Sequence, residues 1–167
     1  MAYMLGRYPA CLPSSLALLA LVAGGSVPSH AQAARMGSGT SAAERTVLAG
    51  SFASEKLWVW QKRLNLQDWD ISLVVARAGE MKPKTVGHIG WDRAKKSAVI
   101  QVLDPADYRL PLDAMLRDIE FTVVHELIHL EMVPILSDLQ RTEANRMEEE
   151  HAVNHMTEAL LKLDRGQ

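Results

Sequence analysis

Two histidines, His125 and His129, lie four residues apart in a long apolar stretch of the chain. A helix places residues at this spacing on one face, so the two imidazoles are expected to project side by side. Burying them together with the adjacent Glu126 would cost free energy unless a partner compensates the three groups. A metal ion held by both histidines removes that cost, and Glu126 would then address a water molecule rather than the metal. The surrounding residues support a buried helix: Val123, Val124, Leu127, Ile128 and Leu130.

A catalytic zinc ion usually has three protein ligands and one open position, so the motif needs a third residue. The closing helix offers Glu148, Glu149 and Glu150, about twenty residues after His129, where a returning antiparallel helix would come back to the metal. Glu149 shares a helical stripe with core residues and is expected to point inwards. Glu150 lies four residues before Asn154, whose amide could hydrogen-bond a ligand histidine. We therefore expect Glu150 to be the third ligand of Zn²⁺, with Glu149 as the alternative.

The hydrophobic periodicity predicts an α+β fold. A stripe formed by Leu57, Trp60 and Leu64 predicts an N-terminal helix that begins near Ser51. Three strands should follow in a short antiparallel or mixed sheet, the last two as a hairpin: residues 69–75, 85–91 and 98–103.

Two further helices are expected to carry the candidate site. The active-site helix runs from Leu112 to about Met132 and is ended by Pro134, and the glutamate helix covers residues 139–163. Ser137 and Asp138 are the expected cap of this second helix.

The N-terminus has the composition of a secretory signal peptide. Residues 1–31 contain no acidic residue and one basic residue, Arg7, followed by the apolar run 16–23 and small residues at Ser29 and Ala31. We expect residues 1–31 to be a signal peptide, 32–50 to be a linker or disordered arm rich in Ala, Gly, Ser and Thr, and 51–167 to form the domain. The mature protein would be secreted or periplasmic, with no stable membrane span after signal cleavage.

Net charge and cysteine content bear on the partners and the kinds of site that this chain can have. The chain has 18 Lys and Arg against 20 Asp and Glu, so nothing in its net charge suggests a nucleic-acid partner. A single cysteine, Cys11, excludes both a disulfide framework and a cysteine-based zinc site within the chain. The sequence leaves the oligomeric state open.

From Trp58 to Leu163 the chain resembles the gluzincins, zinc metallopeptidases with a His-Glu-x-x-His motif and a downstream glutamate ligand. The resemblance is to the minimal single-domain members, and it implies a small zincin-like domain. It also implies that His125 and His129 bind zinc with a glutamate near 149–150, and that Glu126 is the general base. One of two strands, 85–91 or 98–103, would then pair with an extended peptide or protein substrate. The chain departs from the family at Glu131, where an apolar residue is usual.

The motif is compatible with two functions from different classes. The first is zinc-dependent hydrolysis of peptide bonds by a metallopeptidase. The alternative is a non-catalytic, zinc-stabilised domain that binds peptides or proteins, although structural zinc has no need of Glu126. Hydrolysis would also need a donor for the developing oxyanion, for which Tyr108, His151 and His155 are candidates. His88 is expected to be structural or solvent-facing.

Overall fold

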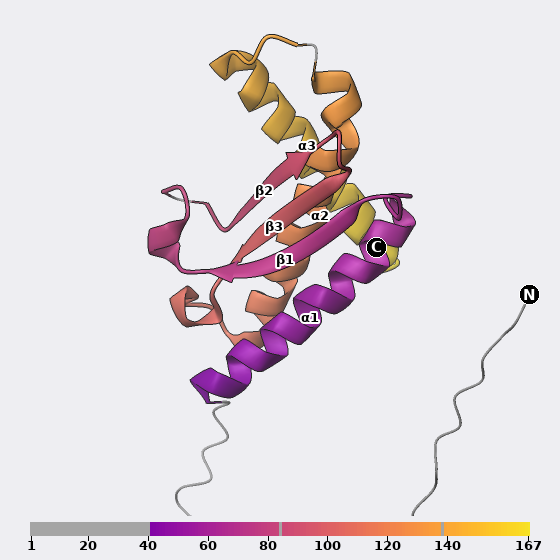
Figure 1. Cartoon of the computed structure of the whole chain (residues 1–167). Helices are drawn as coiled ribbons and strands as arrows, with labels where there is room; N and C mark the ends of the chain where they lie inside the picture. The colour runs from indigo at the N-terminus through magenta and orange to yellow at the C-terminus, as the bar shows by residue number, and fades with distance from the viewer. Residues whose placement is uncertain (1–40, 84, 138) are drawn as a thin grey trace, which may run out of the picture. The chain divides into compact units, whose positions relative to one another are not determined.

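The computed structural model describes residues 41–83, 85–137 and 139–167, which form three long helices and a three-stranded sheet (Figure 1). The α+β class with a mixed three-stranded sheet is thereby confirmed. The expected signal peptide, residues 1–31, lies outside the described residues, as do residues 32–40.

Helix α1 (Ala42–Arg63) begins nine residues earlier than expected, so residues 42–50 are helical and the linker prediction is wrong for them. The cause is a capping box at its first turn. The Ser41 hydroxyl accepts a hydrogen bond from the Glu44 backbone N–H, and the Glu44 carboxylate accepts one from the Ser41 N–H. The buried positions in this first half are alanines, Ala49 and Ala53, which give a weak hydrophobic signal.

The sheet has the strand order β1-β3-β2, with bounds β1 (Asp70–Ala76), β2 (Gly87–Asp92) and β3 (Ser97–Leu103). β2 and β3 form the expected antiparallel hairpin, whereas β1 pairs with β3 in parallel. β3 is therefore central, and one side of β2 is an edge of the sheet. Two short 3₁₀ turns lie in the connections, η2 (Ala78–Glu80) and η3 (Pro105–Asp107).

Helix α2 (Leu112–Leu136) continues through Pro134, contrary to the prediction that this residue ends it. Proline lacks an N–H but has a helical φ, so only one backbone hydrogen bond is lost. The N–H of Ser137 still donates to the carbonyl of Val133 at 3.0 Å, and Ser137 is the C-cap of α2.

Helix α3 (Glu143–Asp164) begins later than expected. Its N-cap is Thr142, whose hydroxyl accepts a hydrogen bond from the Asn145 N–H at 3.1 Å. The predicted cap is therefore wrong for Ser137, and Asp138 lies outside the described residues.

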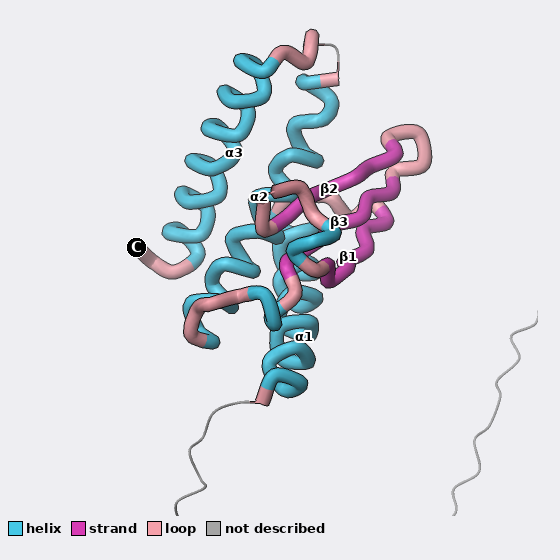
Figure 2. The backbone as a smooth tube through the Cα atoms, turned by 90° about the vertical axis from the view of Figure 1, so that its left-hand side faces the viewer, coloured by secondary structure: helices cyan, strands magenta, loops and turns pink. Residues whose placement is uncertain are grey.

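Helix α2 lies between the sheet and α3 (Figure 2). Its apolar side chains pack against β3 on one side and against α3 on the other, which accounts for its high apolar content. The most completely buried residues of this core are Ile100, Val123, Val124, Leu127, Leu130 and Val153. No helix within the described ranges is long and apolar enough to cross a membrane.

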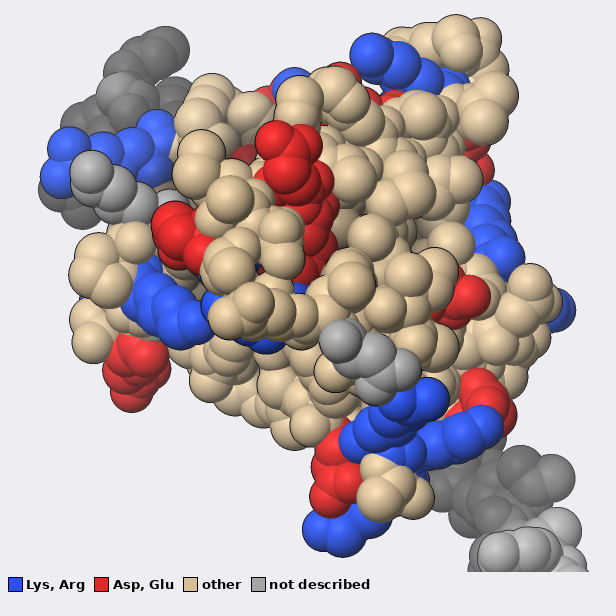
Figure 3. Space-filling model, turned by 90° about the horizontal axis from the view of Figure 1, so that it is seen from above, with Lys and Arg blue, Asp and Glu red and all other residues tan. Residues whose placement is uncertain are grey.

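The end of the molecule that carries the α2–α3 connection is seen in Figure 3. Lys and Arg side chains and Asp and Glu side chains both occur on this face, in small groups separated by uncharged residues. This face therefore presents no single dominant charge.

Candidate metal centre

A pocket lies between α2, α3 and the edge strand β2. Each of these elements contributes polar side chains to it: His125, Glu126 and His129 from α2, Glu149, Glu150 and Asn154 from α3, and His88 from β2. The residues predicted to bind a metal thus lie in one pocket, although they come from two helices that are separated in the sequence.

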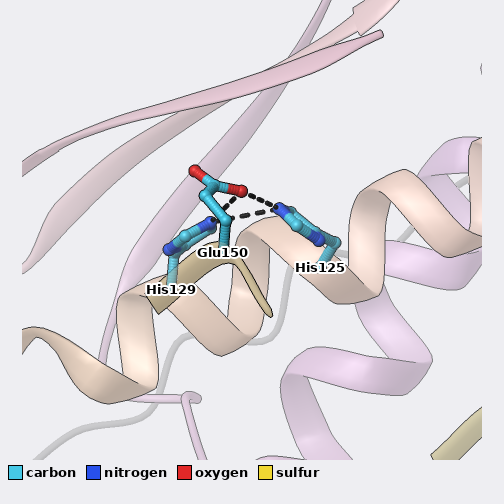
Figure 4. A group of neighbouring side chains, drawn as sticks. All are labelled: His125, His129 and Glu150. Atoms are coloured by element: carbon cyan, nitrogen blue, oxygen red, sulfur yellow. Dashed lines mark hydrogen bonds and ion pairs between the residues drawn. The ribbon is translucent and has the colours of Figure 1, made fainter. Parts of the chain in front are cut away.

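Three atoms with available lone pairs converge in this pocket (Figure 4). The Nε2 atoms of His125 and His129 are 3.1 Å apart, and Glu150 Oε2 lies 3.4 Å and 3.6 Å from them, respectively. Tetrahedral zinc with bonds of about 2.0–2.1 Å requires ligand atoms roughly 3.3 Å apart. The spacing of the three atoms is therefore close to that required, and the three residues form a group that could hold a metal ion.

Glu150, rather than Glu149, reaches the two Nε2 atoms. Consecutive residues of a helix point about 100° apart, so the two glutamates approach His129 from different sides. Glu149 Oε1 lies 2.9 Å from His129 Nδ1, and its Oε2 accepts a hydrogen bond from Arg141 Nη1 at 2.5 Å. Glu149 is thus buried and inward-pointing, as its helical stripe suggested, but it contacts the far side of the histidine ring.

The environment of His125 differs from that of His129. Burial lowers the pKa of His125, and the neighbouring His129 acts in the same direction, while Glu150 and Asn154 oppose them. Asn154 acts on His125 through a side-chain hydrogen bond, whereas His125 Nδ1 is buried and has no partner among the described residues. Both observations favour a neutral imidazole whose Nε2 faces the pocket.

Glu126 lines the same pocket but is not one of the three converging donors. Burial raises the pKa of Glu126 to about 8, and the charge of Glu150 adds to this, while Lys82 opposes it. A bound cation would favour the ionised form of both carboxyls.

The space for Glu126 depends on Gly87 in the edge strand. A Cβ atom at position 87 would lie 2.8 Å from Glu126 Oε1 and 2.3 Å from Thr122 Cγ2. Any side chain there would therefore displace Glu126 or separate β2 from α2.

None of the three residues considered as oxyanion donors lines the pocket. Tyr108 is outside the pocket, where its hydroxyl donates to Asp118 at 2.9 Å, and its pKa is raised by burial and then by that carboxylate. His151 and His155 also lie outside the pocket, exposed on α3, with their ring centroids 4.3 Å apart and their ring planes tilted by 58°. His88 is exposed, in line with the solvent-facing alternative, and it also lines the pocket, which the prediction of a structural or solvent-facing role did not include. Burial, then the charges of Lys82 and His129, lower the pKa of His88.

Arg141 and Gly87 are among the residues of the site that sequence reasoning missed. Arg141 lies in the α2–α3 connection, where no helical periodicity assigns a direction to its side chain. Gly87 adjoins His88 in the strand, and a glycine within a strand is a signal of close approach that could have been used.

Comparison of this chain with protein-family models, with curated proteins and with solved structures finds no match.

Proposed function

We propose that this protein is a zinc metallopeptidase with a small zincin-like domain. The observation that carries the proposal is the convergence of His125, His129 and Glu150 beside the buried carboxyl of Glu126. Two imidazoles and one carboxylate make a three-ligand set of the kind found in catalytic zinc sites, which keep a position open. A closed structural site would require a fourth protein ligand.

When bound, zinc would lower the pKa of a water molecule towards neutrality and polarise a substrate carbonyl. Among the protein's own groups, Glu126 would act as the general base. Its carboxylate would accept a proton from the attacking water as the new C–O bond forms. It would then deliver that proton to the amide nitrogen as the C–N bond breaks, so that no other acid is required.

The edge strand β2 supports a peptide as substrate. Leu103 N–H donates to the Val86 carbonyl at 3.0 Å, and the antiparallel register alternates from there. The backbone groups of Gly87, Ile89 and Trp91 therefore point away from β3, towards the free edge of the sheet. This edge borders the pocket, so an extended peptide that pairs with β2 would pass over the candidate metal centre.

The decisive experiment measures zinc content and peptide cleavage together. Wild type, Glu126→Gln and His125→Ala are compared for bound zinc and then incubated with casein and a peptide library. We expect stoichiometric zinc in wild type and Glu126→Gln, cleavage by wild type alone, and loss of zinc from His125→Ala. Zinc in wild type without cleavage of any substrate would favour the non-catalytic peptide- or protein-binding domain. Folded wild type without affinity for zinc would refute the metal site itself.

A further inference from the structure

A chain of three side chains links the α2–α3 connection to the candidate metal centre. Arg141 Nη1 donates to Glu149 Oε2 at 2.5 Å, and Glu149 Oε1 accepts from His129 Nδ1 at 2.9 Å. The Glu149 side chain is only 5% exposed, so its carboxylate is largely shielded from water. Its neighbours Glu148 and Glu143 are exposed.

The contact at Nδ1 determines what His129 can offer at Nε2. An ionised carboxylate can only accept a hydrogen bond, so His129 Nδ1 must carry the proton. In a neutral ring the lone pair is then on Nε2, the atom that faces His125 Nε2 and Glu150 Oε2. A carboxylate at Nδ1 also fixes the ring orientation and makes Nε2 a stronger donor to a metal.

Arg141 compensates the buried charge of Glu149. A carboxylate removed from water is costly without a counter-charge. The Arg141 side chain itself is 55% exposed, so its own desolvation cost is small. His125 has no such support, because its Nδ1 lacks a partner among the described residues. The two histidines of the motif are therefore held unequally.

We propose that Glu149 and Arg141 are positioning residues of the metal centre, with Glu149 fixing the tautomer and orientation of His129 and Arg141 holding Glu149. This inference rests on the proposed function only in requiring that the site binds a metal ion. It does not depend on whether the protein cleaves peptides.

The test combines metal affinity with the protonation pattern of the His129 ring. Zinc affinity is measured by competition with a chelator for wild type, Glu149→Ala and Arg141→Ala, with Glu148→Ala as the matched exposed control. We expect an affinity loss of about 10- to 100-fold for Glu149→Ala, a smaller loss for Arg141→Ala, partial recovery in Arg141→Lys, and no change for Glu148→Ala.

Imidazole nitrogen NMR of the zinc-free protein separates positioning from a structural role. Wild type and Glu148→Ala should show His129 protonated at Nδ1, and Glu149→Ala should lose this preference. Glu149→Gln keeps an acceptor oxygen without the charge, so it should retain the tautomer in part. Arg141→Ala should weaken zinc binding no further when Glu149 is already alanine, because its effect passes through that carboxylate.

Several outcomes would overturn the inference. Equal zinc affinity in wild type and folded Glu149→Ala would do so, as would an unchanged His129 tautomer or additive effects of the Arg141 and Glu149 substitutions. Absence of zinc binding by wild type would instead refute the metal site, and this inference with it. Zinc binding without peptide cleavage would refute only the proposed activity.

Discussion

Gly87 provides the clearest test at the scale of single residues, because its missing side chain leaves the room that Glu126 and Thr122 occupy. We expect Gly87→Ala to reduce peptide cleavage strongly and to destabilise the fold by about 1–3 kcal/mol, since the new Cβ would overlap two α2 side chains. Thermal unfolding and kcat/KM measure the two effects.

Gly90 is the matched control for this substitution. It lies in the same strand, but a Cβ there would meet nothing within 4 Å. Gly90→Ala should therefore be neutral or slightly stabilising. In a double variant, Thr122→Ser removes the Thr122 methyl group that a Cβ at position 87 would overlap. It should therefore recover part of the stability lost in Gly87→Ala. Equal behaviour of the Gly87 and Gly90 variants would contradict the close approach of β2 to α2.

The residues of the site differ in how well the sequence alone predicts their positions. His125, Glu126 and His129 follow from the helical repeat alone, because four residues make about one turn. The difference between Glu149 and Glu150 does not, because it depends on how α3 is rotated against α2. That rotation is set by the packing of buried residues such as Val153 and Leu161, whose partners the sequence does not give.

The first half of α1 shows why an element can be missed. Its buried face consists of small residues, Ala49 and Ala53, that pack against Met115 and Ile119 of α2. Alanine contributes little to a hydrophobic period, and the segment resembles a flexible linker in composition. The capping box at Ser41 was the local signal that identifies it as a helix.

The packing of this segment predicts unequal effects of two similar substitutions. Ala49→Leu should destabilise the protein by about 1–3 kcal/mol, because the side chain is buried against α2 and extra methyl groups would overfill the contact. Ala43→Leu, at an exposed position of the same helix, should change stability little. Chemical denaturation of both variants measures the change in the free energy of unfolding. An Ala49→Leu variant as stable as wild type would contradict the packing of this segment against α2 and would favour the linker prediction.

Glu120 connects the three helices through buried charge. This α2 carboxylate pairs with Lys56 of α1 at 3.0 Å and with Arg165, the C-cap of α3, at 2.9 Å. Burial raises the pKa of Glu120, but the hydrogen bonds of Arg165 and Lys56 and the charge of Lys56 outweigh it, so the pKa lies below its usual range.

This shift predicts a pH-dependent stability. Because the folded pKa is below the unfolded one, the carboxylate stabilises the fold above about pH 4.5 and loses this effect as the pH falls through the folded value. Glu120→Gln should cost about 2 kcal/mol at pH 7, with a difference from wild type that shrinks towards pH 3. Thermal unfolding across this range measures it, with the exposed Glu158→Gln as control. A difference independent of pH would contradict the ion-pair explanation.

At the scale of the whole molecule, the candidate metal centre would add a further link between two helices that already share side-chain packing, the His129–Glu149 contact and the Glu120–Arg165 ion pair. Two of its donors belong to α2 and the third, Glu150, belongs to α3, so a bound ion would cross-link them. An ion that binds only the folded state at 100 times its Kd adds about 2.7 kcal/mol of stability. For a domain of this size that corresponds to a rise in Tm of roughly 10 °C.

Removing the metal should therefore lower the Tm and increase hydrogen exchange in the first turns of α3 more than in the sheet. The measurement compares wild type with zinc and after treatment with a chelator. Glu150→Ala should lose most of the zinc-dependent shift, because α3 then contributes no ligand. His151→Ala combined with His155→Ala should keep it, since these exposed residues lie outside the pocket. A shift that survives in Glu150→Ala but disappears in the double variant would move the stabilising ion to the outer face of α3, because only there would its ligands have been removed.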